Sequence, residues 1–282
     1  VYASVSAYGP DAPDGHLPGT DAVGQALSGI AEAYSIPGNN LRTGVASVAD
    51  ESCAILTFGG ILAAYINAQK TGKGQKLETS LVGSAFRLLG WTMTTAMWSD
   101  RPPITGARIN GTRERPGIAA CFNDIDEKPF ALQLDPNTWE KAMKALGFYE
   151  ILKTENLIDL GQAFESDDKK NKILNKLAEL FSSNKRDHWI SILRSGDMIS
   201  THVNTMLEAS NDPNLTENNY VTEVWYPELN KNMKVHGSPW KFSKTPANIK
   251  IAPKLGEHNS EILLKLGYSK EEIRNLIEEN II

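Results

Sequence analysis

Residues 47–72 read SVADESCAILTFGGILAAYINAQKTG, and this stretch decides the class of fold. Between positions 53 and 68 apolar side chains occur on every face of a helix, so the pattern predicts a helix that is buried on all sides. Gly72 is placed to act as its C-terminal cap. The apolar run is interrupted by polar residues and glycines and falls short of the roughly 20 residues that a membrane helix needs. We therefore expect a core helix and no membrane partner.

Predicted strands flank this helix. Apolar and polar residues alternate over residues 1–8 and again over 76–81, which is the period of a strand with two different faces. Between the first strand and the helix, Thr20 and Asp21 offer N-cap oxygens for a short helix that Gly29 can close. The order strand, helix, strand predicts an α/β layer, in which ligands often bind at the strand ends.

The composition is that of a globular protein without a nucleic-acid partner. The chain has 282 residues, enough for about two domains. A protein that binds a phosphate backbone would need a local basic patch, which the net charge of -5 does not indicate. Cys53 and Cys121 are far apart and form neither a disulfide framework nor a zinc site, so we expect a reducing, cytoplasmic compartment.

The chain opens with Val1 and runs directly into a strand. No targeting segment is visible, and we expect that the natural N-terminal part is missing.

The second half of the chain has a different pattern. Arginines and prolines between positions 99 and 117 form an irregular loop, where we place a domain boundary. Beyond it the sequence predicts a strand and several helices, one of them capped by Asn137 with Glu140. Two extended runs between positions 220 and 242 predict a hairpin, and residues 269–272 form a capping box for the last of two closing helices.

The familiar catalytic and metal-binding motifs are absent. The sequence has no G-x-S-x-G, no H-E-x-x-H and no complete Walker motif. Residues 71–75, TGKGQ, imitate a phosphate loop but follow a helix, so a cap and turn is the better interpretation. The five histidines lie far apart without the spacing of metal ligands, and we predict no metal site.

Asp50 stands at the start of the apolar helix and has two interpretations. The positive end of the helix dipole favours an ionised carboxylate, which can act as a nucleophile. Ser47 and Asp50 also have the spacing of a capping box, in which the carboxylate only starts the helix. These residues by themselves favour the structural cap.

Several motifs along the chain share their order and spacing with one enzyme family. They are VYASVSAYGP at 1–10, PGTD at 18–21, QALSG at 25–29, Asp50, KTGKGQ at 70–75, Ser80 with Leu81, PKLGEH at 253–258 and LGYS at 266–269. Together they resemble the class III CoA-transferases, the formyl-CoA and carnitine CoA-transferase type. The resemblance spans essentially the whole chain and implies that the family's first third is absent.

The resemblance implies a fold and an assembly. The fold class is α/β, with a Rossmann-like large domain completed by the C-terminal segment and a smaller α+β inserted domain. Residues 1–98 would be the remainder of the large CoA-binding domain, 99–205 the small domain, and 206–282 the return segment and C-terminal helices of the large domain. An interlaced homodimer with active sites near the protomer interface is also implied.

By the same resemblance, Asp50 falls on the family's nucleophilic aspartate. The implied reaction moves CoA from an acyl-CoA thioester to a small carboxylic acid through a mixed anhydride and an aspartyl-CoA thioester. The CoA thioester is a substrate, and no permanently bound cofactor is implied. The helix N-terminus supplies a field that keeps the aspartate charged between the steps.

Three further residues match substrate-binding positions of the family. Tyr8 matches an aromatic position beside the acyl group, and Ser6 and Leu81 match positions that line the CoA channel. Each has a structural alternative, since Tyr8 could simply close a strand end and Leu81 could belong to the core.

The glycine-rich loop of formyl-CoA transferases has no equivalent in this chain. The corresponding region, residues 108–117, carries arginines, so formate and oxalate lose support as substrates. Arg108, or its neighbours Arg113 and Arg115, could meet an acceptor carboxylate or a CoA phosphate. The structural alternative is a solvated loop.

Two other functions stay open. A 2-methylacyl-CoA racemase shares the fold, but Thr20 stands where those racemases have a histidine before the aspartate matched by Asp21, and threonine is no acid or base near neutral pH. His16 lies four residues away and could substitute. The second alternative is a non-catalytic subunit of a CoA-transferase complex, which need not retain Asp50.

Overall fold

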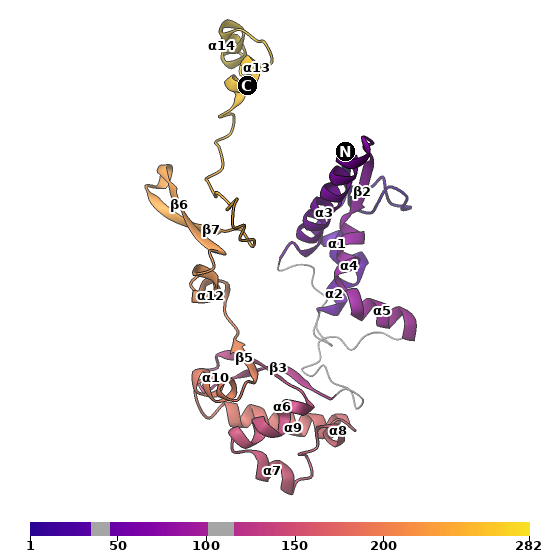
Figure 1. The fold of residues 1–282 in the computed structure, drawn as a ribbon, viewed down its shortest axis with the longest axis vertical. Coiled ribbons are helices and arrows are strands. Elements are labelled where there is room, and N and C mark those ends of the chain that lie inside the picture. Colours follow the sequence, from indigo (N-terminus) through magenta and orange to yellow (C-terminus); the bar gives the residue numbers. More distant parts are fainter. Residues whose placement is uncertain (35–45, 101–115) are drawn as a thin grey trace. The chain divides into compact units, whose positions relative to one another are not determined.

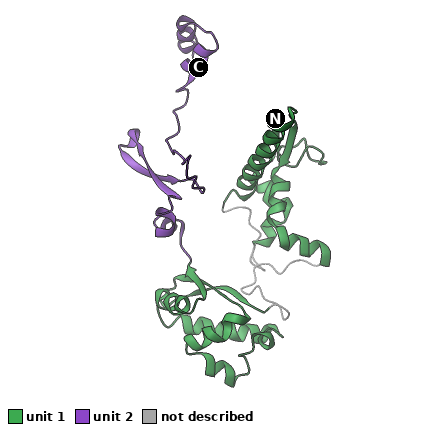
Figure 2. Ribbon diagram, in the orientation of Figure 1, with its two compact units in different colours: residues 1–202 green, residues 203–282 purple. Residues whose placement is uncertain are grey.

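The computed structural model describes residues 1–34, 46–100 and 116–282 of the chain. It divides into two compact units, Val1–His202 and Val203–Ile282 (Figures 1 and 2). The first unit contains both helices and strands in alternation, so the fold is mixed α/β.

The first hundred residues form the predicted strand-helix-strand unit. β1 (Tyr2–Ser6) and β2 (Lys76–Ser80) pair in parallel along their whole length. α3 (Val48–Thr71) lies between them in sequence, and Gly72 ends it by donating its N–H to the carbonyl oxygen of Ala68 at 2.8 Å. A parallel pair needs such a crossover, because both strands start from the same edge of the sheet.

Short helices precede α3 and follow β2. They are α1 (Asp21–Ser28), α2 (Ile30–Ala33), α4 (Leu81–Leu88) and α5 (Gly90–Ser99). The predicted close of α1 at Gly29 is confirmed, because Gly29 has a φ of 90°, a conformation that favours glycine. α1 and α4 pack against α3, and a small core of Ile30, Ala49 and Ala85 joins α2, α3 and α4.

α3 is not buried on all sides, so that prediction is wrong. Its small side chains at Ala49, Cys53 and Ala64 are buried, whereas Ile55 and Tyr65 are 63% and 53% exposed. The physical reason is coverage, since a two-stranded sheet with α1 and α4 can shield only part of a helix of this length. The described residues leave the rest of its apolar surface open.

The length of α3 also differs from the expectation. The helix has 24 residues, and by length and composition it could cross a bilayer, which makes it the one such helix in the described parts of the chain. The inference from insufficient length is therefore wrong. A buried face and a place as the crossover between parallel strands are nevertheless features of a core helix.

Residues 116–202 build a second core around an antiparallel sheet. Its strands β3 (Ile118–Asn123), β4 (Pro129–Leu134) and β5 (Ile199–His202) lie in that order. The helices of this region are α6 (Pro136–Ala145), α7 (Tyr149–Thr154), α8 (Leu160–Ala163), α9 (Asp167–Phe181) and α10 (Arg186–Ser195). Phe181 is fully buried, and its ring centroid lies 5.0 Å from those of Phe122 and Phe130.

The N-cap of α6 is not the predicted one. Asp135 begins the helix, and its carboxylate accepts the backbone N–H groups of Asn137 and Thr138 at 2.9 and 3.0 Å. The Thr138 hydroxyl oxygen accepts the backbone N–H of Asp135 in return, at 3.0 Å. Pro136 explains the shift from Asn137 and Glu140, because proline is favoured at the first helical position.

The C-terminal unit contains the predicted hairpin and closing helices. β6 (Val221–Tyr226) and β7 (Lys231–His236) are antiparallel around the 3-10 turn η1 (Pro227–Leu229). The helices are α11 (Met206–Ala209), α12 (Pro213–Thr216), α13 (Asn259–Lys265) and α14 (Lys270–Glu278). The capping box of Ser269 and Glu272 at the start of α14 is confirmed. The three-part division at residues 98 and 205 stays a prediction.

Asp124 is a buried carboxylate that joins the β3–β4 turn to α10. It is 1% exposed and accepts the backbone N–H groups of Asp126, Lys128 and Arg186, each at 2.8 Å. Burial raises the pKa of this carboxyl, but the three N–H donors and the Arg186 charge outweigh it. The pKa of Asp124 therefore lies below the ordinary value of 3.8.

Asp124→Ala is expected to lower the free energy of unfolding of the 116–202 core by about 3 kcal/mol, because three backbone donors lose a charged acceptor. Urea titration followed by hydrogen exchange of β3 and β4 measures this. Asp126→Ala is the control, since the Asp126 side chain is exposed one turn away, and it should change stability by less than about 0.5 kcal/mol. Equal losses in the two variants would contradict the role of Asp124.

The lowered pKa of Asp124 also predicts a dependence on pH. Its stabilising charge is fully present above the ordinary carboxyl value of 3.8 and is lost as the pH falls through the lower, folded-state pKa. The difference in unfolding free energy between the wild type and Asp124→Asn should be full at neutral pH and shrink below about pH 3.8. Urea unfolding of both proteins across this range measures the difference, and a constant value would show that the charge contributes nothing.

Candidate active site

Asp50 lies in the first turn of α3, at the edge of the sheet where both strands end. Val5 near the end of β1 and Leu81 immediately after β2 line the same hollow as Asp50. This carboxyl edge is where open parallel sheets bind ligands, so the sequence-based expectation of a site at the strand ends has a structural basis.

The structure does not support the interpretation of Asp50 as half of a capping box. Ser47 is the N-cap residue of α3, but its side chain makes no capping hydrogen bond. The Asp50 side chain is exposed, and its carboxylate has no hydrogen bond or ion pair within residues 1–34, 46–100 and 116–282. A carboxylate that does not hold its own helix is available for chemistry.

Asp21 caps α3 from another helix. One carboxylate oxygen, Oδ1, accepts the backbone N–H groups of Ala49 at 2.7 Å and of Asp50 at 3.2 Å. The other, Oδ2, accepts the side-chain amide of Gln25 at 2.5 Å. Sequence reasoning assigned the Asp21 oxygen to α1 and missed Gln25, because no local spacing shows a cap that acts across 28 residues.

Gly24 permits this close approach of α1 to α3. A Cβ atom on Gly24 would lie 2.5 Å from the Cβ of Ala49 and 3.2 Å from that of Leu81. Any larger residue would therefore push α1 away from the first turn of α3. The hydrogen bonds that Asp21 accepts from the backbone of α3 therefore depend on a glycine at this position.

The hollow beside Asp50 has a volume of about 330 Å³ and is mainly apolar. Its lining residues are Val5, Asp50, Cys53, Ala54, Thr57, Phe58, Ile61 and Leu81. The structure thus brings two predicted site residues together, Asp50 and Leu81. Leu81 also packs against the core of Ile30, Ala49 and Ala85, so its structural alternative holds as well.

Ser6 and Tyr8 lie at the same sheet edge but do not line this hollow. The Ser6 hydroxyl accepts the backbone N–H of Gly9 at 3.1 Å, and Ser6 is half-buried. The ring of Tyr8, also half-buried, packs beside Gly19. Arg108, like Arg113 and Arg115, lies outside the described residues.

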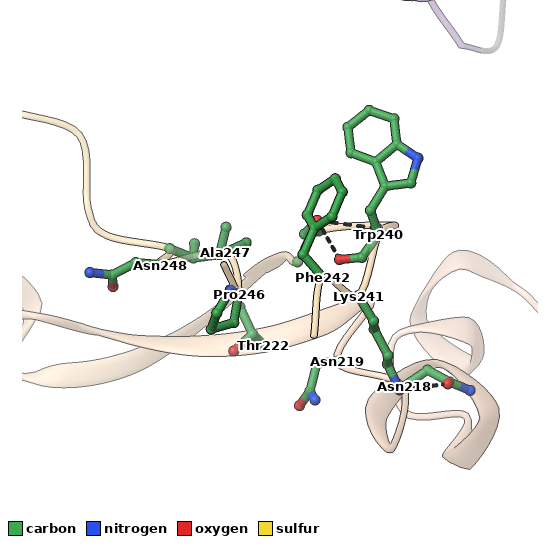
Figure 3. Close-up of a pocket in the computed structure, with 12 residues that line it drawn as sticks. Asn218, Asn219, Thr222, Trp240, Lys241, Phe242, Pro246, Ala247 and Asn248 are labelled. Carbon is green, nitrogen blue, oxygen red and sulfur yellow. Dashed lines mark hydrogen bonds between the residues drawn. The ribbon is translucent and has the colours of Figure 1, made fainter. Parts of the chain in front are cut away.

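A second hollow, in the C-terminal unit, offers binding groups without a carboxylate (Figure 3). It has a volume of about 420 Å³, and its lining includes the half-exposed Trp240 and Phe242. The Lys241 ammonium donates to the Asn218 side-chain oxygen at 3.0 Å. No carboxylate, histidine or cysteine lines it, and the described residues contain no group of three or more such side chains that could hold a metal ion. Of these two hollows, the one beside Asp50 is suited to covalent chemistry.

Comparison with known proteins gives the family to which this chain belongs. The profile of CoA-transferase family III matches residues 1–259, and the chain belongs to that family. A formyl-CoA:oxalate CoA-transferase of Shigella sonnei is 25% identical over 305 residues, which cover 100% of this chain and 71% of that protein. A cinnamoyl-CoA:phenyllactate CoA-transferase of Clostridium sporogenes is 25% identical over 289 residues, covering 98% of this chain and 67% of that protein.

A solved structure shows the same fold. The crystal structure of a CAIB/BAIF family protein from Brucella suis superposes with a TM-score of 0.77 at 20% identity, covering 94% of this chain and 68% of that chain. The resemblance found in the sequence motifs is therefore confirmed at the level of the family, and the chain is of an enzyme family whose substrates are CoA thioesters.

Gly24→Ala is expected to separate α1 from α3 and to loosen the first turn of α3, because the added Cβ would meet Ala49 at 2.5 Å. Amide exchange at Ala49 and Asp50 should accelerate by at least about 5-fold, since a cap bond is worth about 1 kcal/mol or more. Gly59→Ala is the matched control, as its Cβ meets no atom within 4 Å. That variant should keep slow exchange and gain roughly 0.5–1 kcal/mol of helix stability. Identical exchange in both variants would contradict the spacing requirement.

Proposed function

We propose that this chain transfers CoA from an acyl-CoA thioester to a carboxylic acid, with Asp50 as the covalent nucleophile. The observation that carries the proposal is the carboxylate of Asp50, which bonds to none of the described residues and is exposed at the N-terminus of α3, at the wall of an apolar hollow. Family membership supports the reaction class.

The reaction would proceed through two mixed anhydrides. An Asp50 oxygen attacks the thioester carbonyl carbon, the C–S bond breaks, and CoA leaves as a thiolate. The thiolate attacks the Asp50 carbonyl of the anhydride, which gives an aspartyl-CoA thioester and frees the donor acid. The acceptor carboxylate then attacks the aspartyl thioester and expels the thiolate, and the thiolate finally takes the acceptor acyl group and restores Asp50. The donor, aspartyl and product thioesters have similar energies, so covalent catalysis divides the exchange into two nearly balanced transfers, each through a short-lived anhydride.

The residues around Asp50 have supporting roles in this proposal. Leu81 and Val5 exclude water from the anhydride, which water would otherwise hydrolyse. Ser6 and Tyr8 contact the CoA chain and the acyl group from the end of β1. Arg108 meets the acceptor carboxylate or a CoA phosphate.

The apolar lining of the hollow indicates what kind of acyl group the donor carries. The two relatives named above act on formyl-CoA with oxalate and on cinnamoyl-CoA with phenyllactate. A mainly apolar hollow of about 330 Å³ provides more apolar contact than a formyl group can use. We therefore infer an apolar donor acyl group.

The assembly and location are also proposals. An interlaced homodimer is supported by the exposed apolar side chains of α3, such as Ile55 and Tyr65, because an exposed apolar surface of this kind favours a covering partner. A large domain completed by the C-terminal segment and a cytoplasmic location belong to the same proposal.

Asp50→Asn should lower CoA transfer at least about 1000-fold, because an amide oxygen is a poor nucleophile and an amide cannot form the anhydride. The test incubates the full chain with a panel of acyl-CoA donors and acids, and follows both acyl-CoA exchange and a covalent CoA adduct by mass spectrometry. Glu51→Gln is the matched control, since it removes the neighbouring exposed carboxylate of the same turn and should retain full activity.

The outcomes separate the competing functions. An adduct mapped to Asp50 supports the proposal, and normal exchange by Asp50→Asn would overturn it. Loss of deuterium at the α-carbon without CoA exchange would indicate the racemase. Folded protein that never forms the adduct with any donor would indicate a non-catalytic subunit.

A further inference from the structure

We propose that Asp21 is a positioning residue for the covalent step, an inference that rests on the function proposed for Asp50. Asp21 takes over the capping of α3 and so leaves the Asp50 carboxylate free to face the hollow. The two aspartates thus divide between them the two tasks that the sequence pattern assigns to Asp50 alone.

The hydrogen bonds show which oxygen caps α3. Oδ1 of Asp21 accepts two successive N–H groups, from Ala49 and Asp50, at 2.7 and 3.2 Å. These are the second and third residues of the helix, whose N–H groups have no partner inside it. Ser47, the local N-cap residue, contributes no side-chain bond. The backbone of the nucleophile itself is therefore held by a carboxylate from α1, which lies beside the start of α3 (Figure 1).

Gln25 fixes the orientation of Asp21. Its amide nitrogen donates to Oδ2 of Asp21 at 2.5 Å and to the carbonyl oxygen of Ala46 at 3.2 Å. Gln25 is 3% exposed, so burial restricts its side chain to this arrangement. With both carboxylate oxygens engaged, Asp21 cannot rotate away from α3. Gln25 also ties α1 to the residue just before the N-cap of α3.

Asp21 and Asp50 compete for the same free N–H groups at the start of α3, and this competition affects the reaction. A carboxylate in the first turn of a helix readily accepts its own helix's free N–H groups, as in a capping box. Asp21 already occupies the N–H groups of Ala49 and Asp50, and its negative charge repels a second carboxylate from that position. The Asp50 side chain is therefore directed away from its own backbone. Without Asp21, Asp50 would turn back to cap α3 and move off the attack trajectory.

The first experiment compares Asp21→Asn and Asp21→Ala with the wild type in single turnovers with an acyl-CoA donor. The rate of adduct formation on Asp50 should fall about 10-fold in Asp21→Asn, which keeps an acceptor oxygen without the charge, and about 100-fold in Asp21→Ala. In steady state kcat should fall by the same factors, while KM for the acyl-CoA stays within about 3-fold, because Asp21 does not line the hollow beside Asp50.

Asp14→Asn and Asp14→Ala are the matched controls, since they remove an exposed carboxylate from the loop that precedes α1. They should form the adduct at the wild-type rate. All rates are scaled to the folded fraction measured by circular dichroism. If Asp21→Ala does not fold, Asp21→Asn and Gln25→Met carry the test, and Gln25→Met should slow the adduct because it frees Asp21 to rotate.

The result that overturns the inference is a wild-type rate of adduct formation per folded molecule in the folded Asp21 variants, even where their stability is reduced. That result would make Asp21 a structural cap only. Failure of the proposed function gives a different result, because the wild type itself would then form no adduct on Asp50.

Discussion

The N-terminus of α3 is capped by a carboxylate from a different helix, and the geometry of the site depends on this interaction. Asp21 can reach the N–H groups of Ala49 and Asp50 only if α1 lies almost in contact with α3. Gly24 permits that contact, because any side chain there would collide with Ala49. The cap, the glycine and the buried Gln25 together fix the first turn of α3 relative to the ends of β1 and β2.

The parallel pairing of β1 and β2 explains why this turn is the place for chemistry. Both strands end at the edge from which α3 starts, so Val5, Asp50 and Leu81, distant in sequence, surround one hollow. A helix start, a carboxylate without a hydrogen bond or ion pair in the described parts of the chain, and an apolar wall would suit the acyl transfer proposed above. Membership of CoA-transferase family III agrees with this arrangement.

The local pattern predicted many elements correctly, and its errors have physical causes. Alternation gave β1 and β2, and glycine conformations confirm the ends of α1 and α3. The cap of α6 was misplaced by two residues because Asp135 and Asn137 are both good capping residues and Pro136 decides between them. The sequence-based prediction overestimated the burial of α3. An apolar sequence shows which side chains of a helix could be buried, but the neighbouring elements determine how many of them are covered.

The sequence by itself determined the α/β class, the start of the long apolar helix and, through its motifs, the family with Asp50 as the candidate nucleophile. Only the tertiary structure decided that Ser47 does not share a capping box with Asp50, that Asp21 and Gln25 serve this turn instead, and that Leu81 lies beside Asp50. The physical reason is the distance along the sequence over which each interaction acts. Helix and strand periods act over a few residues, whereas a cap acting across 28 residues and a shared hollow exist only when the chain has folded.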